Sequence, residues 1–287
     1  MTPSYAVIGN PIEHSRSPLI HRAFARQLGI ELIYDRLWAP IDGFAEAVAA
    51  FREHGGRGMN VTVPFKLEAY DLAEQRSERA DRALAANTLV FPDSTSDPVL
   101  ADNTDGVGLI NDLAFHGVTL TGSRVLILGA GGATRGVLAP LLDQGPQEIL
   151  IANRNPDRAY GLVEEFNDTA GACRLHGCPL EGIEDTRFDV VINATPASLS
   201  AQLPPLPDTL IGDRTLAYDM AYGPGPTVFM SWAEARGAVR TLDGMGMLVE
   251  QAAESFLLWH GQRPDTAPVR NLLRDDIRRT TEAADTD

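Results

Sequence analysis

A Gly-Ala-Gly-Gly stretch at residues 129–132 stands where a nucleotide would bind an α/β protein. An apolar run at 125–128 precedes it, a helical pattern with one apolar side follows, and a second apolar run occupies 149–152. Glycines at such a junction let the backbone turn tightly and let a pyrophosphate approach the helix N-terminus. Free N–H groups and the helix dipole favour negative charge there. The order strand, glycines, helix, strand therefore predicts a dinucleotide-binding unit.

The segment Asn153-Arg154-Asn155 ends this unit and favours NADP over NAD. An NAD-type unit usually has an acid at this point, which binds the ribose hydroxyls. A guanidinium can instead bind a 2′-phosphate through paired charge-assisted hydrogen bonds and stack on adenine. The sixth position of the glycine motif is Thr134 rather than Gly or Ala. The alternative is a glycine-rich turn followed by a surface arginine, but the order of the elements favours NADP.

Lys66 and Asp105 are the candidates for proton transfer. A nicotinamide-dependent reaction needs a proton donor or acceptor beside the carbon that exchanges hydride. Lys66 is the only lysine of the chain, and it follows a predicted strand at 58–63 and begins a predicted helix. The positive end of the helix dipole makes an ammonium proton easier to lose, and Asp105 could orient that group. The alternatives are a solvated helix end for Lys66 and a helix N-cap for Asp105.

Two hydroxyls, Ser15 and Ser17, follow a predicted strand at 5–9 and begin a helical pattern. Ligands of α/β proteins usually bind at such strand–helix junctions. Ser17 also precedes Pro18, which suits an N-cap with proline in the first turn. Ligand binding and helix capping therefore stay equally open for these serines.

Cys173, His176 and Cys178 lie close together in the sequence and could suggest a metal. On a short loop they lack a fourth ligand, so we expect free thiols and no metal site. Two cysteines are also too few for a disulfide framework.

The elements that must position these residues alternate between strands and helices, which is typical of α/β proteins. Three strand patterns separated by helices occupy residues 5–63, and we expect a second small sheet at 87–91 and 99–101. A helix through Leu109, Ile110 and Leu113, ending at His116-Gly117, then leads to the dinucleotide-binding unit. Further strands at 189–193, 216–220 and 238–242 follow, with helices at 157–166, 227–236, 245–259 and 269–279.

Composition excludes several classes of protein. The chain has 287 residues, enough for two domains, and a formal net charge of −15. A nucleic-acid-binding protein would need a basic surface, which this composition does not supply. No apolar run approaches the roughly 20 residues that span a bilayer, and we see no secretion signal. We therefore expect a cytoplasmic protein without nucleic-acid or membrane partners.

Motifs along nearly the whole chain, from about residue 5 to residue 272, have the order and spacing of one family. They are SRSP (15–18), NVTVPFK (60–66), NT (87–88), DNTDG (102–106), GAGGATR (129–135), NR (153–154), NATP (193–196), DMAY (219–222) and DGMGMLVEQAAESFLLWHG (243–261). In these motifs the chain resembles the shikimate dehydrogenase family. NVTVPFK and the last long helix are specific to that family rather than to nucleotide-binding proteins generally.

The resemblance implies a reversible, NADPH-dependent reduction of 3-dehydroshikimate to shikimate on the chorismate route to aromatic amino acids. It implies an α/β fold with an N-terminal substrate domain that has a mixed sheet, at 1–105. A Rossmann-like NADP-binding domain would follow at 106–244, and helices at 245–287 would pack back on the substrate domain. Shikimate or 3-dehydroshikimate would be the small-molecule partner. The protein would be a monomer or a homodimer.

The resemblance also assigns the site. It implies that Lys66 and Asp105 form the catalytic pair and that Ser15 and Ser17 hold the substrate carboxylate. The remaining substrate contacts would be Thr62, Asn87, Asp105, Tyr222 and Gln251, with Lys66 also touching the substrate. The cofactor residues would be Gly129, Ala130, Gly131, Gly132, Ala133, Asn153, Arg154, Asn155, Met220 and Gly244, with Glu78 on the cofactor side.

Some positions depart from the family's usual pattern. Ala86 replaces a valine before the NT motif, and Ala197-Ser198 stands where a glycine is common. Asn155 replaces Thr, Ser or Lys, so the preference for NADP depends mainly on Arg154. A quinate/shikimate dehydrogenase with relaxed substrate or cofactor use is the nearest alternative. A non-catalytic sensor of shikimate or NADP is a remote one, because it would be expected to lose Lys66 or Asp105.

Overall fold

The structure is a computed structural model that describes residues 2–94, 96–184, 186–195, 197, 202–203 and 205–284. The chain divides into two compact units. Residues 1–108 and 248–275 form the first, and residues 109–247 and 276–287 form the second. The domain boundaries expected from the sequence were 105/106 and 244/245.

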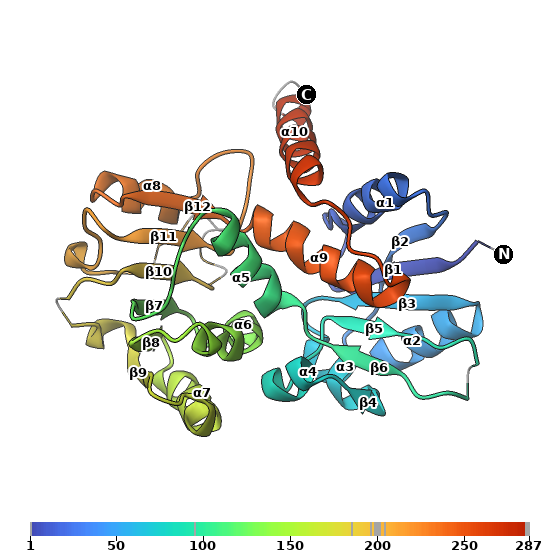
Figure 1. Ribbon diagram of the computed structural model, residues 1–287, viewed down its shortest axis with the longest axis horizontal. Coiled ribbons are helices and arrows are strands. Elements are labelled where there is room, and N and C mark those ends of the chain that lie inside the picture. The colour runs from blue at the N-terminus through green and yellow to red at the C-terminus, as the bar shows by residue number, and fades with distance from the viewer. Residues whose placement is uncertain are drawn as a thin grey trace. The chain divides into compact units, whose positions relative to one another are not determined.

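A six-stranded mixed sheet is the centre of the first unit (Figure 1). Its order is β2-β1-β3-β5-β6-β4, where β1 to β3 run parallel and β5 runs antiparallel to both β3 and β6. The strands are β1 (Ser4–Gly9), β2 (Ile33–Trp38), β3 (Gly56–Val61), β4 (Gln75–Arg76), β5 (Thr88–Val90) and β6 (Leu100–Asp102). The expectation of a second small sheet was wrong. Asn60 on β3 lies opposite Thr88 on β5, so β5 and β6 extend the first sheet.

The two faces of this sheet bury different residues, because successive side chains of a strand point to opposite faces. Ile8 packs in a cluster with Phe44 and Phe65, whereas Val7 packs in a cluster with Tyr34 and Trp259. The helices of residues 1–108 are α1 (Ser17–Leu28), α2 (Phe44–Glu53), α3 (Lys66–Leu72), α4 (Glu78–Ala83) and the start of α5 (Asp105–Phe115).

The second unit contains a six-stranded parallel sheet in the order β12-β11-β10-β7-β8-β9 (Figure 1). The strands are β7 (Arg124–Leu128), β8 (Glu148–Asn153), β9 (Arg174–Pro179), β10 (Val190–Asn193), β11 (Leu216–Asp219) and β12 (Arg240–Asp243). The sheet has the reversal of strand order at β7 that is typical of Rossmann-like folds.

Helices cover both faces of this parallel sheet. Val125 and Ile127 of β7 belong to an apolar cluster with α5, α6 (Gly132–Asp143) and α7 (Pro156–Phe166). Leu126 and Leu128 belong to a cluster on the other face with α8 (Val228–Ala235). Short 3₁₀ turns lie at Asn167–Thr169, Leu180–Gly182 and Asp208–Leu210.

Edge strand β9 corrects the expectation that residues 173–178 form a short loop. It pairs in parallel with β8, and Cys173 and Cys178 are free cysteines just before and near the end of it. Burial raises the pKa of both thiols. In the described part of the chain, no group of three or more His, Cys, Asp or Glu side chains is placed to hold a metal ion.

The last two helices are α9 (Met245–His260) and α10 (Ala267–Ala284). Residues 248–275, which include most of α9 and the start of α10, belong to the first unit. α10 extends beyond the expected end at residue 279. Among the described residues, no helix is both long enough and apolar enough to cross a membrane.

Candidate functional site

Lys66 and Asp105 form a hydrogen-bonded ion pair in the first unit. Lys66 is the first residue of α3 and Asp105 the first residue of α5, and the Lys66 Nζ donates to Asp105 Oδ2 at 2.5 Å. The Asp105 side chain is 4% exposed and the Lys66 side chain 20% exposed. A carboxylate this buried is costly unless it is paired and hydrogen-bonded, and here it is both. Lys66 retains contact with solvent, so it can exchange a proton.

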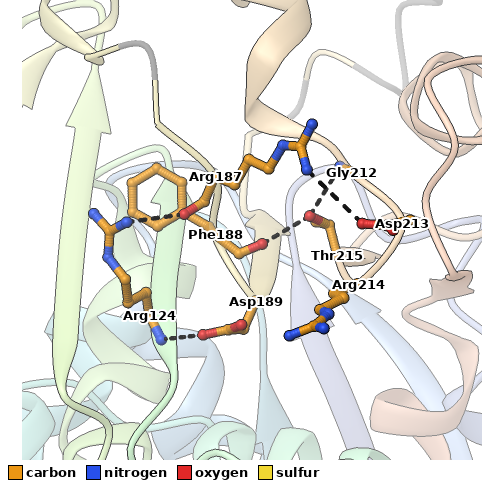
Figure 2. Close-up of a pocket in the computed structure, with 8 residues that line it drawn as sticks. All are labelled: Arg124, Arg187, Phe188, Asp189, Gly212, Asp213, Arg214 and Thr215. Atoms are coloured by element: carbon orange, nitrogen blue, oxygen red, sulfur yellow. Dashed lines mark hydrogen bonds and ion pairs between the residues drawn. The ribbon is translucent and has the colours of Figure 1, made fainter.

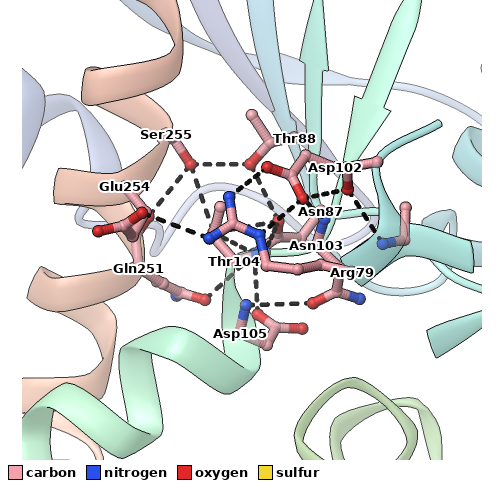
Figure 3. Close-up of polar contacts among 12 residues, drawn as sticks. Arg79, Asn87, Thr88, Asp102, Asn103, Thr104, Asp105, Gln251, Glu254 and Ser255 are labelled. Atoms are coloured by element: carbon pink, nitrogen blue, oxygen red, sulfur yellow. Dashed lines mark hydrogen bonds and ion pairs between the residues drawn. The ribbon is translucent and has the colours of Figure 1, made fainter. Parts of the chain in front are cut away.

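Asn87 connects this pair to α9. Its Nδ2 lies 2.9 Å from Asp105 Oδ1 and 3.3 Å from Gln251 Oε1, and its Oδ1 accepts a hydrogen bond from the Thr104 backbone N–H at 2.9 Å (Figure 3). Four of the residues selected from the sequence, spread from 66 to 251, thus form one polar group. Its members can donate to and accept from the hydroxyl or carbonyl oxygens of a small polar ligand.

The serine pair lies in the same unit. Ser15 Oγ donates to Ser17 Oγ at 3.2 Å, and the Arg36 guanidinium donates to the Ser15 carbonyl at 2.8 and 2.6 Å. Of the two alternatives left open for Ser17, ligand binding and helix capping, the structure excludes capping. Ser17 is already the first helical residue, Arg16 occupies the N-cap position and no side chain caps the helix. The Ser17 hydroxyl is therefore not used in capping.

The first unit contains a further set of hydrogen-bonded polar residues that the sequence analysis did not identify. Tyr34 Oη donates to Asn60 Oδ1 at 2.6 Å, and Asn60 Nδ2 donates to Ser255 Oγ at 2.9 Å and to Thr88 Oγ1 at 3.2 Å. Burial raises the pKa of Tyr34 well above its ordinary value, so it remains a neutral donor. A signal for these residues was available in the sequence, namely polar side chains at positions where apolar ones are usual. Asn60 lies within strand β3, and Ser255 lies on the buried side of α9.

Thr62 and Glu78 are also in the first unit. Thr62 follows β3, and its backbone N–H donates to the Ile8 carbonyl at 2.9 Å. Glu78 is the exposed first residue of α4, and Ser77 caps that helix by accepting from the Ala80 N–H. Among the described residues, no hydrogen bond or ion pair joins Glu78 to the Lys66–Asp105 group.

The glycine turn of the second unit joins β7 to α6. Gly129 has a φ of +105°, and an added Cβ would lie 3.1 Å from the Thr195 side chain and 3.2 Å from the Ala194 backbone. Thr134 Oγ1 donates to the Gly129 carbonyl at 2.7 Å, so the departure at the sixth motif position stabilises the turn. A Cβ on Gly131 or Gly132 would meet nothing within 4 Å. Space is therefore open at the N-terminus of α6, where helix N–H groups have no helical partner.

Asn153, Arg154 and Asn155 lie at the carboxyl end of β8. Asn153 Oδ1 accepts from the Ala130 N–H at 3.2 Å, which ties the glycine turn to this strand. Asn155 is the N-cap of α7 and accepts from the Asp157 N–H at 3.1 Å. Arg154 is exposed, and within the described residues no ion pair involves it.

Met220, Tyr222 and Gly244 follow the neighbouring strands β11 and β12. An added Cβ on Gly244 would lie 2.1 Å from the Met220 carbonyl oxygen, so only glycine fits there without a backbone shift. Tyr222 is in the second unit, unlike the other residues expected to touch substrate. Of the NATPAS loop, Pro196 and Ser198 lie outside the described residues.

A cavity of the second unit lies at the amino ends of the strands of its sheet, opposite to the glycine turn (Figure 2). The residues that line it precede or begin β7, β10 and β11, among them Arg124, Phe188 and Thr215. Ligands of open parallel sheets bind outside the carboxyl ends of the strands. Arg124 is also already bonded to Glu148, at 2.5 Å. This cavity is therefore not the candidate site.

The second unit fits a dinucleotide. The open glycine turn leaves room for a pyrophosphate, the start of α6 supplies N–H donors, and Arg154 adds an exposed cation next to the turn that Asn153 holds. No carboxylate occupies the position of Arg154, which is where an acid would select an unphosphorylated ribose.

Comparison with family models matches three segments of the chain. Residues 7–89 match the shikimate dehydrogenase substrate binding domain, residues 112–201 match shikimate / quinate 5-dehydrogenase, and residues 244–274 match the shikimate 5′-dehydrogenase C-terminal domain. These matches cover both units that carry candidate residues.

Similar proteins agree with the models. A shikimate dehydrogenase (NADP(+)) of Nitrosospira multiformis is 52% identical over 278 residues, covering 96% of this chain and 99% of that protein. The solved structure of an Ael1 enzyme from Pseudomonas putida is 48% identical, with a TM-score of 0.87 and 95% and 98% of the two chains covered. Shikimate 5-dehydrogenase from Thermus thermophilus, in complex with NADP(H) and shikimate, is 32% identical, with a TM-score of 0.84 and 96% and 99% covered. The chain therefore belongs to the shikimate dehydrogenase family of oxidoreductases.

Proposed function

We propose that the protein is a shikimate dehydrogenase that catalyses the reversible NADPH-dependent reduction of 3-dehydroshikimate to shikimate, with Lys66 and Asp105 as the proton-transfer pair. The observation that carries this proposal is the 2.5 Å contact between these two side chains, beside Asn87 and Gln251. Relatives that are about half identical over nearly their whole length support the choice of reaction. The reaction would serve the chorismate route to aromatic amino acids.

Lys66 has the proton role in this mechanism. NADPH, when bound by the second unit, would be the source of hydride for the carbonyl carbon of the substrate. The ammonium group of Lys66 gives a proton to the carbonyl oxygen, so that no alkoxide is left in the site. Asp105 holds the amine in place through its Oδ2 before and after the transfer. Because the Lys66 side chain is 20% exposed, the amine can regain its proton from solvent.

The remaining polar groups would orient the substrate. Ser15 and Ser17 would donate to its carboxylate, since they are two hydroxyls 3.2 Å apart and the Ser17 hydroxyl is not used as a helix cap. Thr62, Asn87, Gln251 and Tyr222 would contact its hydroxyls or its edge. Asp105 would accept a hydrogen bond from a ring hydroxyl and hold Lys66 at the same time.

The second unit would hold the cofactor. The backbone of the glycine turn, Gly129 to Ala133, would bind the pyrophosphate. Arg154 would bind the 2′-phosphate, with Asn153 and Asn155 fixing the backbone around it. Met220 and Gly244 would border the nicotinamide half, and Glu78 would lie on the cofactor side. We further propose a cytoplasmic enzyme without nucleic-acid partners that works as a monomer or a homodimer.

Steady-state oxidation of shikimate and of quinate, each with NADP and with NAD, tests this proposal. Absorbance of the reduced cofactor measures the rate. Turnover with shikimate and NADP alone would support it, whereas comparable rates with quinate or NAD would assign the protein to a broader quinate/shikimate group. Tight binding of shikimate without turnover would instead support a sensor.

The only lysine of the chain permits a second test. An amine-selective reagent can modify only Lys66 and the N-terminus, and peptide mapping separates the two products. Shikimate should slow modification of Lys66 and leave the N-terminus unaffected. Equal rates with and without shikimate would place Lys66 away from the ligand.

A further inference from the structure

Asp102 is a buried carboxylate that the proposed chemistry does not use. It is the last residue of β6, three positions before Asp105, and it is 1% exposed. A charge in such a place is stable only with a close partner and with hydrogen bonds for its remaining lone pairs. The partners of Asp102 therefore show which residues stabilise the turn at 102–105, which ends at Asp105.

Arg79 of α4 is the ionic partner of Asp102. Its Nη2 lies 2.5 Å from Asp102 Oδ2 and its Nε lies 3.1 Å from Asp102 Oδ1, which is the two-point geometry that only arginine provides (Figure 3). Ser77 Oγ donates to the same Oδ1 at 2.5 Å. The remaining Nη1 of Arg79 reaches Glu254 of α9 at 3.4 Å. Arg79 thus ties the end of β6 to the helix that carries Gln251.

From Asp102 a series of hydrogen bonds leads to Asp105. Asp102 Oδ1 accepts from the Asn103 backbone N–H at 2.7 Å. Asn103 Oδ1 accepts from the Asp105 backbone N–H at 3.1 Å, and Asn103 Nδ2 donates to the Ala85 carbonyl at 3.0 Å. With the contact from Asn87 to the Thr104 N–H, side chains hold each successive backbone N–H of the turn.

We propose that Arg79 is a positioning residue of the reaction. By holding Asp102 it fixes the turn at 102–105, so that Asp105 stays within hydrogen-bonding distance of Lys66. This inference rests on the proposed roles of Lys66 and Asp105. Displacement of a catalytic group by about 1 Å can lower a rate by roughly 100-fold, so a residue that touches neither substrate nor cofactor can control turnover.

Arg263 offers a matched control for Arg79. It makes 2.6 Å ion pairs with Glu254 and with Glu250, and its side chain is 35% exposed, against 34% for Arg79. Within the part of the chain that the structure describes, neither of these ion pairs involves Asp102. Arg79→Met therefore removes one ion pair with α9 and Arg263→Met removes two, but only the first variant releases the turn at 102–105.

The test compares kcat and KM for shikimate in these two variants, with NADP affinity and thermal unfolding measured on the same samples. We expect Arg79→Met to lower kcat by about 10- to 100-fold, with a smaller change in KM, and Arg263→Met to stay within about twofold of the unchanged protein. Similar kcat losses in both variants would overturn the proposal, since general loosening of α9 would then explain them. If Arg79→Met does not fold, Arg79→Lys against Arg263→Lys makes the same comparison, because lysine keeps the charge and loses the two-point contact.

A double variant tests whether Arg79 acts through Asp102. If it does, the kcat of Arg79→Met with Asp102→Asn should be no lower than that of Arg79→Met alone, because both changes break the same contact. If the losses in kcat of the two single variants multiply in the double variant, Arg79 does not act through Asp102. Turnover by the unchanged protein distinguishes failure of the proposed function from failure of the proposed role of Arg79. Absence of shikimate turnover there refutes the proposed function, whereas normal turnover with equal losses in the variants refutes only the role of Arg79.

Discussion

The two candidate regions are built by different means. In the first unit, side chains form the site, and Lys66, Asp105, Asn87 and Gln251 come from four separate segments joined by hydrogen bonds. In the second unit, backbone forms most of the site, through one glycine turn within the strand–helix–strand segment that ends at Arg154. The first is largely saturated with internal partners, whereas a Cβ at Gly131 or Gly132 would meet open space.

This difference follows from what each region must do. A proton-transfer site has to hold a few atoms within a fraction of an ångström, so its side chains restrain one another. A cofactor site has to admit a long anion, so it offers open space and N–H groups. We therefore expect substitutions in the first unit to act mainly on kcat, and substitutions in the second mainly on cofactor affinity.

The largest effect is expected for Lys66→Ala. Loss of the proposed general acid should lower kcat by about 10²- to 10⁴-fold, the usual contribution of general acid–base catalysis. The dissociation constant for shikimate, measured by calorimetry, should change far less. Comparable losses in rate and in affinity would mean that Lys66 only positions the ligand, and the contrast between the two units would fail.

A pair of glycine variants sharpens the contrast within the second unit. Gly129→Ala should destabilise the fold by about 1–3 kcal/mol, because residue 129 has a positive φ and a crowded Cβ direction. Gly131→Ala should leave the melting temperature nearly unchanged, since its Cβ meets no protein atom, and should weaken NADP binding. Thermal unfolding and NADP titration of both variants measure this. Unchanged NADP affinity in Gly131→Ala would show that the space is not used by the cofactor.

Arg154→Gln should raise KM for NADP by about tenfold, the effect of losing roughly 1.4 kcal/mol of phosphate binding. KM for NAD and kcat with saturating NADP should change little, because the 2′-phosphate is far from the reacting carbon. Parallel rate measurements with both cofactors decide the matter. An equal loss with NAD would assign Arg154 to general stabilisation of the turn.

The smallest effect on turnover at neutral pH is expected for His21→Leu, which should act on stability. It lies fully buried against Tyr34, at 4.3 Å between ring centroids, and burial lowers its pKa to about 3. The unfolded chain protonates this histidine near pH 6.5, whereas the folded chain does so only near pH 3. The free energy of unfolding should therefore decrease as the pH is lowered from about 6.5 to 3, by up to roughly 1.4 kcal/mol per pH unit. Urea unfolding at pH 7 and pH 5 should show a weaker pH dependence in His21→Leu. The same slope in both proteins would exclude His21 as its source.

The sequence predicted the second unit more completely than the first, because the glycine turn and its flanking strands lie within one local segment. Lys66 and Asp105 could be selected by residue type, but their contact depends on how α3 and α5 begin around one sheet. The polar support from Asn60, Ser255 and Arg79 was not predicted. Such residues have no periodic signal, and only the folded topology gives them partners.

Errors in the secondary structure also have physical causes. The strand β9 contains Gly177 and Pro179, lies at a sheet edge and buries little, so it lacks the apolar run of a central strand. Strands β5 and β6 were expected as a separate sheet because nothing in their sequence indicates a partner. The pairing of Asn60 with Thr88 joins them to β3.

The order of the segments has a consequence for biosynthesis on the ribosome. Gln251, Ser255 and Trp259 belong to the first unit, yet residues 109–247 are translated before them. At about 5–20 residues per second, Asn87 and Asn60 leave the ribosome on the order of ten seconds before their α9 partners exist. The uninterrupted stretch 109–247 can form its parallel sheet in that interval. The substrate-side unit, although most of it is made first, cannot reach its final state until residues 248–275 have been made.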